Sequence, residues 1–322
     1  MRVPPAAIYV PEEDRKAILA QIDEALRTGQ LTLGKIGRQF EEEFAASCGT
    51  RYAIAVNSGT SAIEIVLRAI GVEGREVLVP ANTFFATAAA AAHSGAKVRF
   101  LDCAPETFSI DPDDLEKQIG PETAAVVIVH IGGIVSADIA RIKAVCDAKG
   151  VPLVEDAAHA HGSSLGGVMA GAFGKAATFS FYPTKVITSA EGGMIVTNDE
   201  ALYQEALIYR DQGKAGFTTN FHTRLGSNWR LSEVHAAIGL SQFRRLGEFI
   251  DHRNSIARIY DEELGRVEGV RPIRSADGSR NNYYKYIAML PDGVDRAALK
   301  KVLRENYDVG LSGEVYETPL HI

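Results

Sequence analysis

The chain has 322 residues, of which 46% are hydrophobic and 23% are charged, a composition typical of a water-soluble globular protein with one large domain or two modest ones. Its 34 basic and 41 acidic residues give a formal charge of −7, which argues against a protein that coats nucleic acid or an anionic membrane. Three scattered cysteines without a C-x-x-C pair, and an N-terminus without an apolar signal core, indicate a cytoplasmic protein with neither a disulfide framework nor a metal site.

Short runs rich in β-branched and apolar residues recur along the first two-thirds of the chain, and helix-like segments separate most of them. Several runs are apolar almost throughout, which is typical of strands that are covered on both faces. The alternation predicts a doubly wound α/β sheet, whose ligands bind beyond the carboxyl ends of the strands. The runs are Tyr52–Asn57, Glu76–Pro80, Lys97–Asp102, Ala124–His130, Pro152–Ala158, Ala176–Phe181 and Gly193–Asn198.

Helical periodicity begins at Ser61, returns over residues 139–148, and then forms one long pattern over residues 231–264. The last segment combines a short apolar run, a Pro-Asp-Gly turn and a helix-like stretch. We therefore expect a large cofactor-binding domain over residues 1–250 and a small C-terminal α+β domain over residues 251–322.

The segment Asn57-Ser58-Gly59-Thr60-Ser61 follows a predicted strand and opens a predicted helix. Backbone N–H groups and hydroxyls at a helix N-terminus suit a phosphate, although Ser and Thr there also serve as plain helix caps. The spacing matches neither the P-loop nor the G-x-G-x-x-G dinucleotide turn, so a dehydrogenase is disfavoured.

Two acids, Glu155 and Asp156, end the strand predicted before His159. Neighbouring side chains on a strand point to opposite faces, so only one of the two acids can face a given ligand. Strand-end acids also serve as helix caps or metal ligands, and the pattern of these residues alone leaves those alternatives open.

Lys185 lies in a loop after Phe179-Ser180-Phe181-Tyr182-Pro183-Thr184 and before the pair Gly192-Gly193. A lysine that is desolvated among apolar neighbours has a lowered pKa, which makes its amine nucleophilic toward a carbonyl. A phosphate cradle, a strand-end carboxylate and a loop lysine are together the features of a pyridoxal phosphate site, because this cofactor needs a Schiff-base lysine and an acid at its ring nitrogen.

In these residues the chain resembles the DegT/DnrJ-type sugar aminotransferases, which have fold type I of the pyridoxal phosphate enzymes. The resemblance implies a large domain with a mostly parallel seven-stranded sheet between helices. Family members usually continue past the final Pro319-Leu320-His321-Ile322, so it also implies that the small C-terminal domain is incomplete here. The matching segments are Gly34 with Phe40–Phe44, Asn57–Ala62, Pro80–Thr87, Gly95–Asp102, Glu155–Gly162, Phe179–Gly193 and Gly226–Gln242.

The resemblance further implies roles for residues around the cofactor ring. Lys185 and Asp156 would be catalytic, Lys185 as the Schiff-base lysine and Asp156 as the partner of the pyridine nitrogen. His159 stands where the family usually has Gln or a similar polar residue, near the phenolic oxygen of the cofactor. Phe84 would stack on the ring.

The phosphate of the cofactor would be held by Ser58, Gly59, Thr60 and Ser180. Asn228 would reach the phosphate in the neighbouring subunit, which implies a homodimer with shared active sites. The alternative for Asn228 is that it caps the long helix that follows it.

The family implies transfer of an amino group from glutamate or glutamine to a nucleotide-linked keto-deoxysugar. A related branch of the fold has His in place of the Schiff-base lysine and dehydrates sugars, so Lys185 favours transamination. Two alternatives stay open: a keto-cyclitol aminotransferase would share every cofactor residue, and a non-catalytic regulator could keep the fold.

Overall fold

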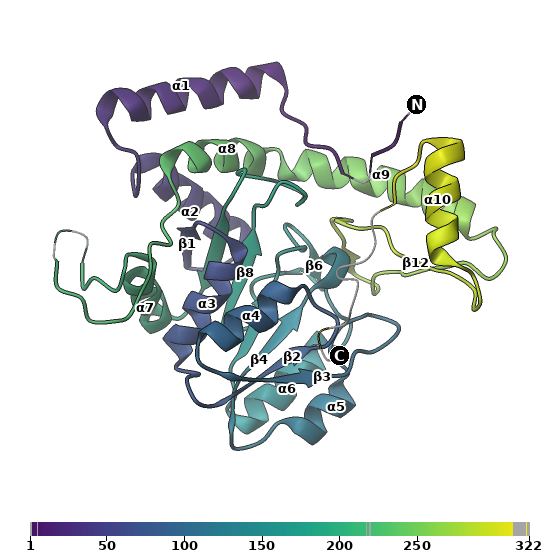
Figure 1. Ribbon diagram of the computed structural model, residues 1–322, viewed down its shortest axis with the longest axis horizontal. Coiled ribbons are helices and arrows are strands. Elements are labelled where there is room, and N and C mark those ends of the chain that lie inside the picture. Colours follow the sequence, from purple (N-terminus) through teal and green to yellow (C-terminus); the bar gives the residue numbers. More distant parts are fainter. Residues whose placement is uncertain (1, 5, 217, 219, 312–319, 321–322) are drawn as a thin grey trace.

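A seven-stranded sheet forms the centre of the computed structural model, which describes residues 2–4, 6–216, 218, 220–311 and 320 (Figure 1). The strands are β1 Tyr52–Val56, β2 Glu76–Pro80, β3 Lys97–Leu101, β4 Thr123–Val129, β5 Leu153–Asp156, β8 Ala176–Ser180 and β9 Gly193–Thr197. They lie in the order β1-β9-β8-β5-β4-β2-β3, with β9 antiparallel to both its neighbours and the other pairs parallel. The predicted α/β fold with a mostly parallel sheet is confirmed, and each predicted strand is present within two residues of its expected bounds.

Helices cover both faces of the sheet, because successive side chains of each strand point to opposite sides. In β1, Ala53 and Ala55 belong to one apolar core and Ile54 and Val56 to the other. The first face is covered by α2 Lys35–Cys48, α6 Ile139–Lys149 and α8 Glu233–Arg244, and the second by α3 Gly59–Ile70, α4 Phe85–His93 and α7 Glu200–Arg210. β4 is buried along its whole length, as expected for a strand between two helical layers.

Further α-helices pack against these layers or, in the case of α10, lie away from them. They are α1 Glu12–Thr28, α5 Pro112–Gln118, α9 Leu246–Leu264 and α10 Arg296–Tyr307. α1 lies along the outer side of α8 at the top of Figure 1, whereas α10 stands apart at the right. Within the part of the chain that the structure describes, we find no helix with the length and apolarity needed to cross a bilayer.

The single helical pattern predicted over residues 231–264 is wrong in one respect, since the structure has two helices there. α8 ends at Arg244, and α9 begins at Leu246. Between them Arg245 adopts φ −95° and ψ 0°, which is outside the helical range. Its guanidinium pairs with Glu13 and Asp14 of α1, so the break is stabilised by an ion-pair cluster between elements that are far apart in the sequence.

The C-terminal segment is joined to the main sheet region by short strands. β11 Ser279–Arg280 pairs with β6 Ser164–Leu165, which pairs with β7 Val168–Met169. A separate pair is formed by β10 Arg271–Pro272 and β12 Ala288–Met289. Because α9 runs through residue 250, the division into domains at 250 and 251 stays a proposal. Of the last four residues, Pro319, His321 and Ile322 lie outside the described residues.

Candidate active site

The N-terminus of α3 lies against the end of β8 and forms a narrow cradle there. A Cβ atom added at Gly59, the first residue of α3, would lie 2.8 Å from the Cβ of Ser180. A Cβ atom added at Gly193 would lie 2.3 Å from the carbonyl oxygen of Ser58. Only glycine permits these approaches, and they bring the backbone N–H groups of a helix N-terminus next to a serine hydroxyl. Such a set of donors suits a phosphate group.

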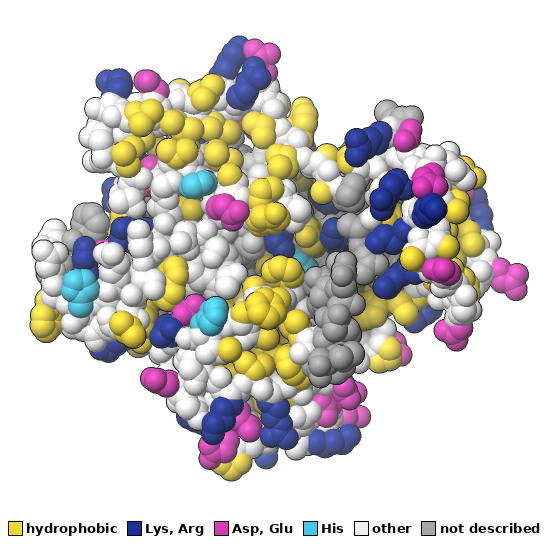
Figure 2. Space-filling model, in the orientation of Figure 1, with side chains coloured by type: hydrophobic (Ala, Val, Ile, Leu, Met, Phe, Trp, Pro, Cys, Tyr) yellow, Lys and Arg dark blue, Asp and Glu magenta, His cyan; other side chains and the backbone are white. Residues whose placement is uncertain are grey.

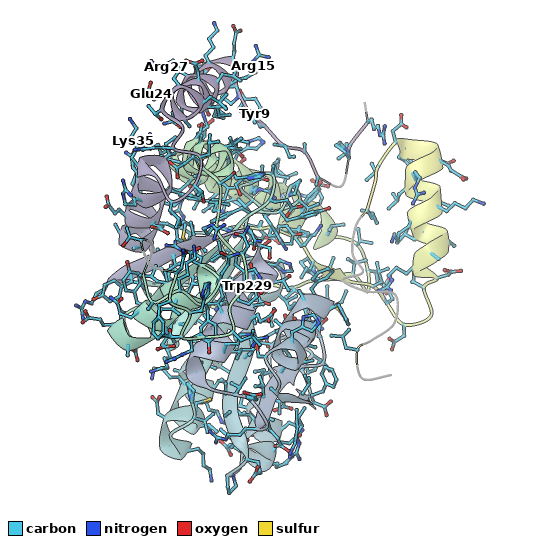
Figure 3. All side chains as sticks on the ribbon, turned by 60° about the vertical axis from the view of Figure 1, so that its left-hand side comes forward. Tyr9, Arg15, Glu24, Arg27, Lys35 and Trp229 are labelled. Carbon is cyan, nitrogen blue, oxygen red and sulfur yellow. The ribbon has the colours of Figure 1, made fainter. Side chains whose placement is uncertain are left out.

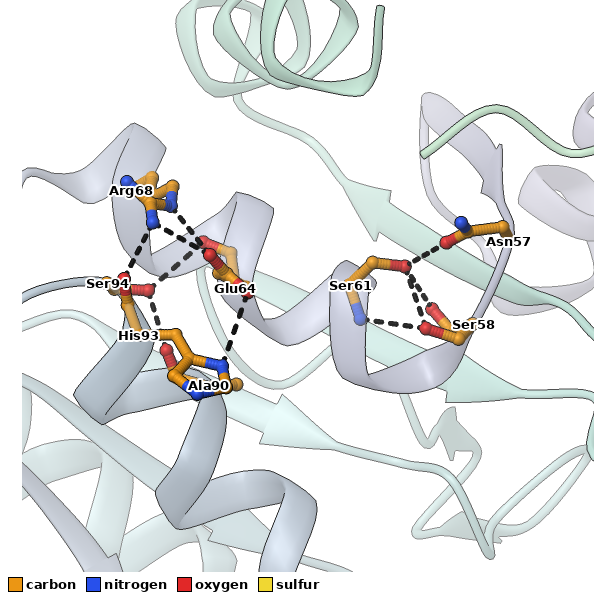
Figure 4. A network of polar contacts seen from close by, with 8 residues as sticks. All are labelled: Asn57, Ser58, Ser61, Glu64, Arg68, Ala90, His93 and Ser94. Atoms are coloured by element: carbon orange, nitrogen blue, oxygen red, sulfur yellow. Dashed lines mark hydrogen bonds and ion pairs between the residues drawn. The ribbon is translucent and has the colours of Figure 1, made fainter. Parts of the chain in front are cut away.

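Hydrogen bonds along α3 hold this cradle in place (Figure 4). Ser58 caps the helix, because its Oγ accepts from the N–H of Ser61 at 3.0 Å. Two turns later Arg68 donates to Oε1 of Glu64 at 2.8 Å and to the carbonyl of His93 on α4 at 2.6 Å. These bonds fix α3 to α4. Phe84, which is predicted to stack on the cofactor ring, directly precedes α4.

Asp156 is the last residue of β5 and is only 6% exposed. Its Oδ2 accepts a hydrogen bond from Oγ1 of Thr87 at 2.7 Å, and its Oδ1 accepts from the N–H of Ala158 at 3.1 Å. Thr87 is in turn bonded to Thr83 at 2.7 Å between their Oγ1 atoms. These contacts fix the orientation of the carboxylate at the carboxyl edge of the sheet.

Glu155 points to the opposite face of β5 and is fully buried. Its carboxylate accepts hydrogen bonds from the N–H groups of Gly171, Phe173 and Gly174, and it bonds to Nε2 of His130 at 2.9 Å. A carboxylate with four protein partners on the far face has no free side for a ligand. Asp156 is therefore the strand-end acid that lies near Lys185.

Lys185 lies in the loop after β8, where its N–H donates to the carbonyl of Tyr182 at 2.9 Å. Burial lowers the pKa of its amine to about 8, although the negative charge of Asp156 acts in the other direction, and the charge of Lys285 lowers the pKa further. The Nζ atom lies 5.0 Å from the ring centroid of Tyr284. At neutral pH this amine is deprotonated far more often than an ordinary lysine, as a nucleophile requires.

His159 packs against the same tyrosine ring, with 4.3 Å between the ring centroids and an angle of 29°. Its Nδ1 accepts a hydrogen bond from the N–H of Gly132 at 3.3 Å, so the ring proton lies on Nε2. Burial, and after it the charge of Lys185, hold the pKa of the imidazole well below its usual value. His159 is therefore a neutral donor through Nε2.

Two further predicted cofactor residues lie at the surface of this single chain. The Phe84 side chain is 56% exposed, directly before α4. Asn228 is also exposed, and its carbonyl accepts from Nδ2 of Asn57 at 3.2 Å, beside Trp229 (labelled in Figure 3). The alternative that Asn228 caps the following helix is wrong, because the Oγ of Ser232 caps α8.

Sequence reasoning missed the C-terminal residues of this site and predicted only an apolar run there. Asn282 donates from Nδ2 to the carbonyls of His159 and His161, at 2.8 and 3.0 Å, and its Oδ1 accepts from the N–H of Tyr284 at 2.8 Å. These bonds bring Tyr284 and Lys285 to the site. The available signal was the Asn-Asn pair before the aromatic residues, because Asn side chains often bond to backbone groups in turns.

The residues at this edge fit pyridoxal phosphate. The cradle between Gly59 and Ser180 suits its phosphate, and the hydrogen-bonded Asp156 carboxylate suits its ring nitrogen. The Lys185 amine, with its lowered pKa, is suited to form a Schiff base with the cofactor's carbonyl group. Neutral His159 offers an N–H for the phenolic oxygen.

Comparisons with known proteins agree with this chemistry. The sequence profile of the DegT/DnrJ/EryC1/StrS aminotransferase family matches residues 12–322. GDP-perosamine synthase of Caulobacter vibrioides is 33% identical over 324 residues, which cover 100% of this chain and 86% of that protein. L-glutamine:2-deoxy-scyllo-inosose aminotransferase of Streptomyces kanamyceticus is 38% identical over 267 residues, which cover 79% of this chain and 62% of that protein.

A solved structure has the same fold. DesI, crystallised in the presence of its TDP-sugar product, superposes with a TM-score of 0.88 at 30% identity. The match covers 98% of this chain and 79% of the DesI chain.

Proposed function

Because the chain belongs to the DegT/DnrJ/EryC1/StrS aminotransferase family, whose members depend on pyridoxal phosphate, we propose that it moves an amino group from glutamate or glutamine to a nucleotide-linked keto-deoxysugar. The chain is an aminotransferase with this cofactor, and the sugar and the amino donor are the proposal. The relatives named for GDP-perosamine and for a TDP-sugar product support a nucleotide-linked acceptor.

The observation that carries the proposal is the meeting of Lys185, Asp156 and the Gly59–Ser180 cradle at one edge of the sheet. Bound pyridoxal phosphate supplies a carbonyl that takes up amines and a ring that accepts the electrons left on the donor carbon. Asp156 would hold the proton on the ring nitrogen. Lys185 Nζ would take the proton from the Cα of the donor as general base and give it back as general acid.

Neighbouring side chains fix the orientation of the groups that would act on the cofactor. His159 donates from Nε2, and its ring is fixed between the Gly132 N–H and Tyr284. Tyr284 is itself held by the bond between its hydroxyl and Oγ1 of Thr184, at 3.3 Å. These contacts therefore hold His159 and Tyr284 in place beside Lys185.

We also infer a homodimer whose subunits complete each other's sites. Large apolar side chains are exposed along α1, among them Leu19 at 58% and Leu26 at 63% (Figure 2 shows hydrophobic side chains gathered on this helix). Phe84 and Phe85 are exposed beside the site as well. Exposed apolar surface of this kind favours a protein interface, and the side chain of Asn228 is exposed as well.

The test is a single-turnover reaction of the holoenzyme. Glutamate or glutamine should bleach the absorbance of the lysine-bound cofactor and release one 2-oxo acid per site. Keto-deoxysugars linked to GDP or TDP should then restore the absorbance. Failure of both glutamate and glutamine to bleach the band would overturn the proposed donor.

A keto-cyclitol acceptor is the second candidate, and it is favoured by the similarity to the 2-deoxy-scyllo-inosose aminotransferase. The same assay separates the two candidates. If 2-deoxy-scyllo-inosose restores the absorbance and the nucleotide-linked sugars do not, the acceptor is a cyclitol.

A further inference from the structure

Two buried threonines lie in a chain of hydrogen bonds that ends at Asp156. Thr87 lies in the first turn of α4, and Thr83 lies in the loop between β2 and that helix. Both residues are fully buried. Oγ1 of Thr87 is 2.7 Å from Oδ2 of Asp156 and 2.7 Å from Oγ1 of Thr83, so the two hydroxyls and the carboxylate are linked in one series.

The direction of this chain follows from the protons that each group carries. An ionised carboxylate only accepts hydrogen bonds, so the hydroxyl of Thr87 donates its proton to Asp156. A hydroxyl has one proton to donate, and Thr87 therefore accepts from Thr83. Both hydroxyl protons point toward Asp156. Hydrogen bonds aligned in this way polarise one another, which strengthens the bond to the carboxylate.

The other oxygen of the same carboxylate is held as well. Oδ1 of Asp156 accepts from the N–H of Ala158 at 3.1 Å. Each carboxylate oxygen therefore has a donor within the protein and keeps lone-pair capacity for a ligand. In general, a donor that bonds to the charged form of a carboxylate stabilises that form against taking up a proton.

We propose that Thr83 and Thr87 are positioning residues that keep the ring nitrogen of pyridoxal phosphate protonated, and that they act through Asp156. The inference rests on the role proposed for Asp156 in this site, and it does not depend on the amino donor or the sugar.

The proton between the ring nitrogen and the carboxylate can lie on either partner. On the nitrogen, it leaves a cationic ring and an anionic carboxylate. If the N–H bond breaks and an O–H bond forms instead, both groups become neutral. The hydroxyl chain stabilises the first arrangement, because its last bond is charge-assisted only while the carboxylate is anionic. A protonated ring is also the better acceptor for the electrons left on the donor carbon.

The experiment measures the protonation of the ring nitrogen directly. Holoenzyme is prepared with pyridoxal phosphate that carries ¹⁵N in its ring, and solid-state NMR records the ¹⁵N chemical shift in the wild type, Thr87→Val, Thr87→Ser and Thr83→Val. Asp156→Asn marks the shift of the unprotonated nitrogen. Thr123→Val is the matched control: Thr123 is also buried, and its Oγ1 accepts from the N–H of Gly120 at 3.0 Å where β4 begins, at the opposite edge of the sheet.

We expect the signal of Thr87→Val to move from the wild-type position toward that of Asp156→Asn, and the signal of Thr83→Val to move less far in the same direction. Thr87→Ser, which keeps the hydroxyl, and Thr123→Val should keep the wild-type position. The rate of Cα proton abstraction should fall by about tenfold in Thr87→Val, the effect of losing one hydrogen bond to a charged group.

An unchanged signal in Thr87→Val would overturn the inference alone, and so would an equal movement in Thr87→Ser or in the Thr123→Val control. If Thr87→Val does not bind the cofactor, Thr83→Val decides by the same criterion. If Asp156→Asn itself leaves the signal at the wild-type position, the role proposed for Asp156 fails and this inference fails with it.

Discussion

Glu155 and Asp156 are neighbours in the sequence, yet β5 places their carboxylates in different surroundings. Glu155 accepts three backbone N–H bonds and contacts His130 on one face of the sheet. Asp156 is held by Thr87 on the side of Lys185. The sequence predicted that only one acid could face a ligand, and the choice between them depends on these long-range partners.

This difference predicts different defects for two isosteric substitutions. Asp156→Asn removes the charge that keeps the ring nitrogen protonated, so cofactor binding should persist while Cα proton abstraction slows by roughly 100-fold or more. Glu155→Gln should instead lower the free energy of unfolding by about 1–3 kcal/mol, because a buried acceptor is weakened. Stopped-flow absorbance and denaturant unfolding measure the two effects. A near-normal rate of Cα proton abstraction in Asp156→Asn would show that another acid keeps the ring nitrogen of the cofactor protonated.

The lowered pKa of Lys185 predicts how the apoenzyme takes up its cofactor. Only the neutral amine attacks the carbonyl, so the rate of cofactor attachment should rise with pH and level off above about 8. Lys285→Met removes a charge that lowers this pKa, so its midpoint should move to higher pH, while Lys143→Met should leave it unchanged. A midpoint near the ordinary value of 10.5 in the wild type would contradict the burial of the amine.

At the scale of elements, the sheet could be predicted because each strand carries its own signal. Runs such as β4 are apolar from their second residue onward, and this pattern is local. The break at Arg245 could not be predicted, because it depends on acids of α1 that are far away in the sequence. The place of Tyr284 depends in the same way on the bonds of Asn282 to the loop after β5.

The junction of α3 and β8 predicts the effect of one added methyl group. Gly59→Ala would place a Cβ 2.8 Å from the Cβ of Ser180, so the cradle must open. We expect its affinity for pyridoxal phosphate to fall by roughly tenfold or more. Gly247→Ala is the control: no atom lies within 4 Å of its added Cβ in α9, so it should not change the affinity. Fluorescence titration of each apoenzyme measures its affinity for pyridoxal phosphate. If Gly59→Ala binds the cofactor as tightly as the wild type, the cradle does not hold the phosphate.

At the scale of the whole molecule, the site lies where the helical layers, the sheet edge and the C-terminal segment meet. The sequence could point to Asp156, Ser180 and Lys185 as candidates, since they lie at or just after the ends of predicted strands. Asn228 is different, because its backbone lies at Asn57 while its side chain is exposed. The role of this exposed side chain across a dimer stays a prediction.

Subunit exchange tests this prediction. Inactive Lys185→Ala dimers and impaired Asn228→Ala dimers are mixed under conditions that allow proven exchange. If Asn228 acts in the neighbouring subunit, each heterodimer has one site with both substitutions and one with neither, so up to half of its sites should be active. If Asn228 acts within its own chain, every site keeps one defect and mixing should restore nothing.

The central claim is that Lys185 is the lysine that binds the cofactor, and borohydride reduction tests it most directly. Reduction of the holoenzyme should fix the cofactor to the peptide that contains Lys185, and the wild-type absorbance band should be absent from Lys185→Ala. That variant should still bind the cofactor through the Gly59–Ser180 cradle without turnover. Label on Lys285 or on any other lysine, with Lys185 unmodified, would contradict the account.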